Sequence, residues 1–216
     1  MDAERTVLLF TGGDPVDPRL ALRLPDEAFV IAADSGLAQA VVLGRRVDLA
    51  VGDFDSVDLD ALERAQRSGA VVERHPEAKD ETDLELGLAA AAGRCADHVV
   101  VVGGHGGRVD HFLANALLLA SPRFAAMRVE AYVGASTITV VRERAELRGA
   151  PGDLVSLLAV GGAASGVRTE GLVYPLRGER LDAGSTRGVS NVFIGADASV
   201  ELDDGTLLAV QPGTGG

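Results

Sequence analysis

Short apolar runs alternate with helical patterns over the first two thirds of the chain. Runs typical of β-strands span residues 6–10, 29–33, 49–51, 70–73, 97–102, 129–133 and 137–141. Helical spacing predicts helices over residues 37–43 and 59–67, from Thr82 onward, and over residues 110–120. Because strands alternate with helices, the pattern predicts an α/β domain with a mostly parallel sheet, covering residues 1–141.

The pattern changes after about Arg142. Glycines recur, helical periodicity disappears, and β-rich runs span residues 154–160, 171–176, 189–194, 199–202 and 207–210. Asp204-Gly205 separates the last two runs, as is typical of a hairpin turn. We therefore predict a second, all-β domain over residues 142–216, folded as a small sandwich or barrel.

Composition narrows the possible partners and compartment. The chain of 216 residues is 47% hydrophobic, which is typical of a globular protein, and no apolar run approaches the roughly 20 residues of a membrane span. A net charge of −12 disfavours nucleic acid and anionic membranes as partners. The single cysteine, Cys95, excludes an internal disulfide, and the acidic N-terminus argues against a signal peptide. We expect a cytoplasmic protein.

Acidic residues follow two of the predicted strands. Asp34-Ser35-Gly36 comes after one, and Gly52-Asp53-Phe54-Asp55-Ser56 after the next. In an extended backbone the Asp53 and Asp55 side chains would point the same way, and the two carboxylates would repel unless a cation lay between them. Mg²⁺ prefers such oxygen ligands. The alternative is a solvated turn, in which Asp and Ser are common.

A third acidic segment opens a predicted helix. In Lys79-Asp80-Glu81-Thr82-Asp83, Thr82 has the position of an N-cap, with Glu85 three residues later. Acidic residues in a first helical turn complement the helix dipole, which accounts for Asp83 without any further role. The dipole does not account for Lys79, the only lysine among 20 basic residues.

A glycine-rich loop follows the strand at residues 97–102. Gly103-Gly104-His105-Gly106-Gly107 leads into Arg108, Asp110 and His111, at the start of a predicted helix. Backbone N–H groups at a helix N-terminus and an arginine would both bind phosphate, although such a loop is also compatible with a plain tight turn. The glycine spacing does not fit a Rossmann fingerprint, and the sequence has no Gly-Lys-Ser/Thr of a Walker A loop. The four histidines lack zinc-ligand spacing.

Four ordered motifs resemble those of the thiamine pyrophosphokinase (thiamin diphosphokinase) family. They are Ala33-Asp34-Ser35-Gly36, Gly52–Ser56, Lys79–Asp83 and Gly106-Gly107-Arg108-Val109-Asp110-His111. In the C-terminal part, Gly171–Leu176 resembles the family's thiamine-side segment and Gly188–Asn191 its Ser-Asn element. Tyr174 stands where animal and fungal members carry tryptophan. A tyrosine ring can still stack on a pyrimidine, with a smaller contact area than tryptophan.

The resemblance implies a Mg²⁺-dependent transfer of the pyrophosphoryl group of ATP to the thiamine hydroxyl, giving thiamine diphosphate and AMP. It implies a nucleotide- and metal-binding catalytic domain, a thiamine-binding β domain, and a homodimer with its sites between subunits.

The resemblance also implies roles for individual residues. The Mg²⁺ ligands would be Asp34, Asp53, Asp55 and Asp83. Charge on the transferred group and the leaving AMP would be neutralised by Lys79 and Arg108, with Asp110 orienting Arg108 or the metal. The nucleotide would also contact Ser35, Gly36, Ser56, Thr82, Gly106 and Gly107. Thiamine would contact Tyr174, Ser190 and Asn191. The general base stays open between an aspartate of the cluster and His111.

Two other functions compete with this one. A pyrophosphokinase acting on a pterin alcohol would need the carboxylates and glycine loop but not the C-terminal thiamine elements. A non-catalytic nucleotide-binding or sensor module would be expected to lack metal carboxylates, and none is missing from the sequence. The presence of the C-terminal thiamine elements favours the thiamine enzyme over the pterin enzyme, and the order of the motifs favours it over an α/β protein with turn-rich loops.

Overall fold

The chain forms two compact units in this computed structural model, which describes residues 4–76 and 80–213. Unit 1 comprises residues 1–118 and 126–134, and unit 2 comprises residues 119–125 and 135–216. After residues 119–125, which belong to unit 2, the chain returns to unit 1 and passes finally to unit 2 between Gly134 and Ala135. The strand at residues 136–141, which the sequence placed in the first domain, therefore belongs to unit 2.

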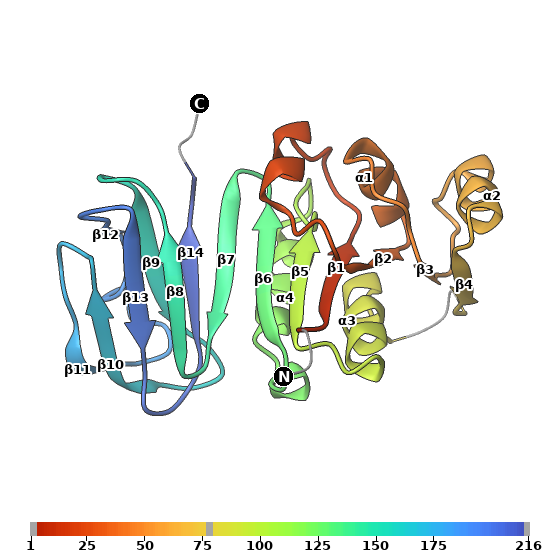
Figure 1. Cartoon of the computed structure of the whole chain (residues 1–216). Coiled ribbons are helices and arrows are strands. Elements are labelled where there is room, and N and C mark those ends of the chain that lie inside the picture. The colour runs from red at the N-terminus through yellow and green to blue at the C-terminus, as the bar shows by residue number, and fades with distance from the viewer. Residues whose placement is uncertain (1–3, 77–79, 214–216) are drawn as a thin grey trace. The chain divides into compact units, whose positions relative to one another are not determined.

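Unit 1 is built on a parallel sheet with the strand order β6-β5-β1-β2-β3-β4 (Figure 1). Its strands are β1 (Thr6–Phe10), β2 (Phe29–Ala33), β3 (Leu49–Gly52), β4 (Val71–Arg74), β5 (His98–Val102) and β6 (Arg128–Val133). Its helices are the 3-10 helix η1 (Pro18–Arg23), α1 (Gly36–Val42), α2 (Leu59–Arg67), α3 (Asp83–Gly93) and α4 (Val109–Leu119).

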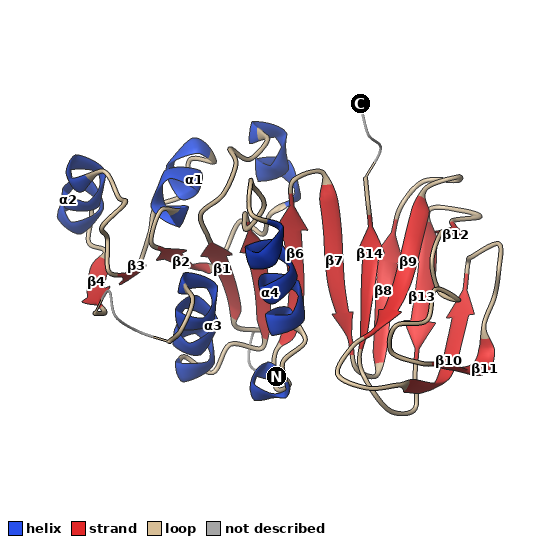
Figure 2. Ribbon diagram, turned by 180° about the vertical axis from the view of Figure 1, so that it is seen from behind, coloured by secondary structure: helices blue, strands red, loops and turns tan. Residues whose placement is uncertain are grey.

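Helices cover both faces of this sheet, which is why the strands β1, β2, β3 and β5 are almost continuous apolar runs. Leu8 and Phe10 of β1 belong to the core cluster that includes Leu37 of α1 and Leu62 of α2. Leu9 points to the opposite face, where α3 packs so closely that a Cβ at Gly87 would overlap the Leu9 side chain. Figure 2 shows α3 and α4 together on that face. Successive strand residues alternate between two buried faces, as expected of a parallel sheet.

The topology brings several loops to one edge of the sheet. All six strands are parallel, so the loops that follow β1, β2, β3 and β5 leave from the same, carboxyl edge. The strand order reverses at β1, which has β2 on one side and β5 on the other. Ligands of open α/β sheets bind beyond this edge, at such a reversal.

Unit 2 is an antiparallel β-sandwich. One sheet has the order β12-β9-β14-β7 and the other β11-β10-β13-β8. Their bounds are β7 (Ser136–Val141), β8 (Arg144–Arg148), β9 (Leu154–Ala159), β10 (Ala164–Glu170), β11 (Arg177–Leu181), β12 (Asn191–Val192), β13 (Asp197–Glu201) and β14 (Leu207–Gln211); the short helix η2 (Pro122–Phe124) also belongs to this unit. Leu157 and Leu207 from one sheet pack in the same core as Val167 and Val200 from the other. The predicted fold class, a mostly parallel α/β domain followed by an all-β domain, is confirmed.

Two strand predictions in unit 2 are wrong. Residues 171–176 form no strand beyond an isolated bridge between Leu172 and Phe193, and the predicted strand 189–194 shrinks to β12. Gly171 has φ +75°, and a Cβ there would overlap the Asp197 carbonyl, so the chain turns at this point. The Val173 N–H donates to a strand carbonyl, that of Val192 at 2.9 Å, whereas the Tyr174 and Leu176 N–H groups donate to side chains, Leu176 to Thr169 Oγ1 at 2.9 Å.

Candidate functional site

Three carboxylates meet at the carboxyl edge of the unit 1 sheet. Asp34 follows β2, and Asp53 and Asp55 follow β3; one carboxylate oxygen from each lies within 4.8 Å of the other two. The set is all oxygen, and oxygens bound to one Mg²⁺ are about 3 to 4 Å apart, so small side-chain rotations would bring these three into its coordination shell. The residues therefore fit a hard divalent cation, and we call them the acidic trio.

The loop from Asp53 to Ser56 is held by Asp34. Asp34 is buried, with 6% of its surface exposed. Its Oδ1 accepts a hydrogen bond from the Phe54 N–H at 3.2 Å, and its Oδ2 accepts one from Ser56 Oγ at 2.6 Å. Asp34 therefore fixes the loop that carries the other two carboxylates, in addition to facing any cation they bind.

The backbone of the acidic trio is not extended. Phe54 has φ +62° and Asp34 has φ +47°, the left-handed region that is costly for residues other than glycine. The expectation that an extended backbone aligns Asp53 and Asp55 is therefore wrong. Instead, the buried Phe54 ring and the bonds to Asp34 hold a strained turn, a feature that concentrates at functional sites.

The start of α3 is as predicted. Thr82 is its N-cap, with Thr82 Oγ1 accepting from the Glu85 N–H at 3.3 Å, and Asp83 is the first helical residue. Asp83 is not a member of the acidic trio, whereas the sequence placed it among the metal ligands. Lys79 lies outside the described residues.

The glycine-rich loop after β5 depends on backbone conformations that favour glycine. Gly103, Gly104, Gly106 and Gly107 all have positive φ, between +47° and +143°. The loop leads to Arg108, whose guanidinium donates two hydrogen bonds to Asp110, from Nε at 3.2 Å and from Nη2 at 2.6 Å. This pairing lowers the pKa of Asp110 to about 2, so its carboxylate is ionised at neutral pH and orients Arg108.

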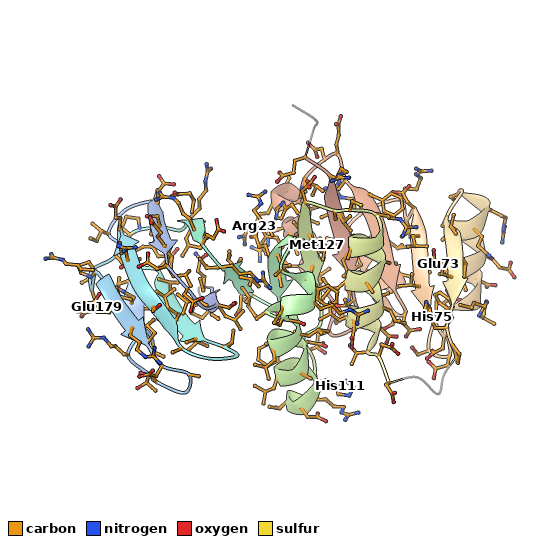
Figure 3. All side chains as sticks on the ribbon, turned by 90° about the horizontal axis from the view of Figure 1, so that it is seen from below. Arg23, Glu73, His75, His111, Met127 and Glu179 are labelled. Atoms are coloured by element: carbon orange, nitrogen blue, oxygen red, sulfur yellow. The ribbon has the colours of Figure 1, made fainter. Side chains whose placement is uncertain are left out.

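Two histidines outside the glycine-rich loop, His75 and His111, lie far apart along the sheet. His111 is exposed in the first turn of α4, whereas His75 follows β4 at the opposite edge of the sheet (Figure 3). Of the two, His111 alone adjoins Asp110 and the glycine-rich loop.

The sequence analysis missed a further loop, Thr11–Asp14, at the same edge. It follows β1, and it bonds to the glycine-rich loop: the Gly104 N–H donates to Gly12 O at 2.7 Å, and the Asp14 N–H to His105 O at 2.6 Å. Thr11 Oγ1 is buried and has no hydrogen-bond partner among the described residues. The signal was present, since Thr11-Gly12-Gly13 ends a strand as the acidic and glycine-rich loops do.

In unit 2, the predicted thiamine residues are neighbours with different surroundings. Tyr174 is 65% exposed, and Ser190 is exposed with φ +60°. Asn191 is buried: its Oδ1 accepts from the Tyr174 N–H at 3.0 Å and its Nδ2 donates to Tyr174 O at 2.8 Å. Asn191 thus fixes the backbone of Tyr174, and the Tyr174 and Ser190 side chains are left accessible.

Comparison with known proteins gives a match to each unit. The model of the thiamin pyrophosphokinase catalytic domain matches residues 21–131, and the model of the thiamin pyrophosphokinase vitamin B1 binding domain matches residues 136–207. The first match identifies the class, a kinase-type transferase. The chain belongs to the thiamin pyrophosphokinase family, and the resemblance noted in the sequence is confirmed.

Individual relatives agree with the family models. A thiamine pyrophosphokinase of Bacillus subtilis (strain 168) is 25% identical over 222 residues, which cover 96% of this chain and 98% of that protein. The crystal structure of thiamine pyrophosphokinase from Bacillus subtilis has a TM-score of 0.83 at 24% identity, covering 97% of this chain and 99% of that one. Thiamin pyrophosphokinase from Candida albicans has a TM-score of 0.73 at 16% identity, covering 95% and 89%, so the fold is shared across distant sequences.

Among the described residues, 4–76 and 80–213, every helix is too short or too polar to cross a bilayer.

Proposed function

We propose that this chain transfers the pyrophosphoryl group of ATP to the hydroxyl of thiamine, giving thiamine diphosphate and AMP. The observation that carries the proposal is the acidic trio at the carboxyl edge of the sheet, in a chain whose other unit matches a vitamin B1 binding domain. The thiamine hydroxyl oxygen attacks the β-phosphorus of ATP, the bond from that phosphorus to the α–β bridging oxygen breaks, and AMP leaves.

We propose that the acidic trio holds Mg²⁺, with Asp83 approaching from the start of α3. When bound there, Mg²⁺ would neutralise charge on the triphosphate, which is the main requirement of this type of transfer. The three carboxylates are close enough to share one cation, and Asp34 also keeps the Asp53–Ser56 loop in place.

We assign the remaining charge neutralisation to Arg108 and Lys79. Asp110 holds the Arg108 guanidinium in a fixed orientation, so less freedom is lost when a phosphate binds. The N–H groups of Gly106 and Gly107 lie in the same loop and would donate to phosphate oxygens. The proton of the thiamine hydroxyl would pass to an aspartate of the acidic trio or to His111.

For thiamine, we propose the side chains of Tyr174 and Ser190. Tyr174 offers an exposed aromatic surface for stacking, and Asn191 holds its backbone in place.

We further propose that the protein acts as a cytoplasmic homodimer with sites between subunits. Sedimentation of the purified protein would test whether it is a dimer.

The test of the reaction is AMP release from ATP and Mg²⁺, with thiamine and a hydroxymethylpterin supplied as parallel acceptors. The proposal predicts AMP with thiamine and none with the pterin. AMP formed with the pterin would keep the chemistry and overturn the acceptor. No AMP with either acceptor, from folded protein, would overturn the proposed function.

A further inference from the structure

One buried polar side chain of unit 1 has no place in the proposed chemistry. Gln39 lies in α1, one turn after Ser35, and only 5% of its surface is exposed. A primary amide at such a depth is costly unless its donors and acceptor are paired. The partners of Gln39 therefore indicate what its side chain does.

All three partners of the Gln39 amide belong to the loop that follows β1. Its Nε2 donates to Gly13 O at 3.2 Å and to Asp14 O at 3.0 Å, and its Oε1 accepts from the Val16 N–H at 3.1 Å. Two carbonyls on one end and an N–H on the other fix the orientation of the amide. Residues 13–16 are thereby tied to α1.

The same loop is in close contact with two segments that carry candidate catalytic residues, the start of α1 next to Asp34 and the glycine-rich loop that leads to Arg108. On one side, a Cβ at Gly12 would overlap the hydroxyl of Ser35, the residue after Asp34. On the other side, a Cβ at Gly13 would overlap the His105 carbonyl, and two backbone hydrogen bonds join the loop to Gly104 and His105. The loop thus lies between the N-terminus of α1 and the glycine-rich loop.

We propose that Gln39 is a positioning residue for the transfer, and this proposal rests on the proposed function. It holds the Thr11–Val16 loop against the glycine-rich loop, and so keeps Arg108 at a fixed distance from the acidic trio. Gln39 itself touches no substrate in this role. Its loss should leave thiamine binding intact and slow the transfer, since that step depends on how Arg108 and the carboxylates are placed.

The test is the substitution Gln39→Glu in the full-length protein. It preserves size, but a carboxylate cannot donate to the two carbonyls of Gly13 and Asp14. The matched control is Gln66→Glu, which makes the same change of charge at an exposed position in α2. Gln39→Met, which removes the amide without burying a charge, is the second variant if Gln39→Glu does not fold.

Two readouts are needed. The first is hydrogen exchange without ligands, in peptides covering residues 11–16 and 103–108. We expect exchange in both to rise about tenfold or more in Gln39→Glu and to stay unchanged in Gln66→Glu. The second is steady-state kinetics, in which kcat should fall by about 100-fold while the KM for thiamine changes by less than threefold.

The outcomes separate this proposal from the function on which it rests. Faster exchange in residues 11–16 with no change in residues 103–108, or a kcat equal to that of Gln66→Glu, would overturn the positioning role. If the wild-type protein forms no AMP, the proposed function is overturned instead. The AMP assay on the wild type shows this before any variant is made. The exchange experiment needs no activity, so it decides the coupling of the two loops in either case.

Discussion

The two groups of candidate residues solve different physical problems. In unit 1, three carboxylates are gathered at one edge of the sheet, where they repel one another. In unit 2, a neutral side chain, Asn191, uses its polar atoms within the protein to fix the backbone of the exposed Tyr174. Bringing the three carboxylates together lowers the stability of the protein, and a bound cation would offset this loss. The residues of unit 2 are instead stabilised by their own hydrogen bonds.

Both groups nevertheless contain residues other than glycine with positive φ. Four residues other than glycine have positive φ in the described part of the chain, and three of them are Asp34, Phe54 and Ser190. Each lies in a loop with a proposed role. A strained backbone conformation persists in a folded protein only where surrounding interactions stabilise it. Here these interactions are the hydrogen bonds to Asp34 and the bond from the Ser190 N–H to Ser156 Oγ at 3.1 Å.

The largest effect on turnover is expected for Asp53→Asn. Removing one carboxylate should lower Mg²⁺-dependent turnover by about 1,000-fold or more, since charge neutralisation dominates this chemistry. Stability without metal should stay level or rise slightly, because one of three repelling charges is gone. Turnover and urea unfolding would be measured on the same preparation.

Asp26→Asn is the matched control, a change of the same charge at an exposed position of unit 1. Its turnover should equal that of the wild type. Near-normal turnover in Asp53→Asn would remove Asp53 from the metal site.

A large loss of stability is expected for Asn191→Ala. The substitution leaves the Tyr174 N–H and C=O without their partner, at a cost of about 2–4 kcal/mol in the free energy of unfolding. Urea unfolding followed by circular dichroism would measure it. Ser190→Ala, next along the chain but with an exposed side chain, should change the free energy of unfolding by less than about 0.5 kcal/mol. Equal effects at the two positions would contradict the distinction drawn between them.

Tyr174→Ala should change binding and leave the fold intact. Loss of the exposed ring should raise the KM for thiamine about tenfold, worth about 1.4 kcal/mol, with a smaller change in the KM for ATP. Tyr174→Phe, which keeps the ring, should stay close to the wild type. An unchanged thiamine KM in Tyr174→Ala would exclude Tyr174 from the site.

The smallest effect is expected for Tyr132, the other tyrosine of the chain. Burial in unit 1 raises the pKa of its hydroxyl from 10.0 to about 12. Between these values the unfolded chain ionises first, so this group's contribution to stability is complete below pH 10 and is lost as the pH rises to about 12. Tyr132→Phe should therefore weaken the decline of stability with pH in this range. A decline as steep as that of the wild type would show that Tyr132 is not its source.

Charged and glycine-containing motifs could be recognised from the sequence because several of them follow predicted strands and occur in a specific order along the chain. Asp34, Asp53 and Asp55 each follow a buried strand, and parallel strands bring their carboxyl ends to one edge. The left-handed Phe54 could not be foreseen, since the tertiary bond from its N–H to Asp34 holds that conformation. Only the family resemblance placed Asp83 with the trio; it opens α3, as its N-cap Thr82 predicts, and lies outside that group.

Neutral residues were harder to interpret. Gln39 carries no motif, and its role depends on a loop that is 23 to 26 positions away in the sequence. In unit 2, the apolar run over residues 171–176 has the composition of a strand, but Gly171 turns the chain and Thr169 supplies the bond to Leu176. Side-chain bonds to backbone of this kind compete with strand pairing and leave no periodic pattern.

The most direct test of the central claim is ³¹P NMR of the wild-type protein with ATP, thiamine and Mg²⁺, repeated with excess EDTA. The account predicts that AMP and thiamine diphosphate appear in equal amounts with Mg²⁺ and that neither appears with EDTA. Formation of ADP with thiamine monophosphate, or of AMP with free pyrophosphate, would contradict transfer of a pyrophosphoryl group to thiamine. Full turnover in EDTA would contradict the role of the acidic trio.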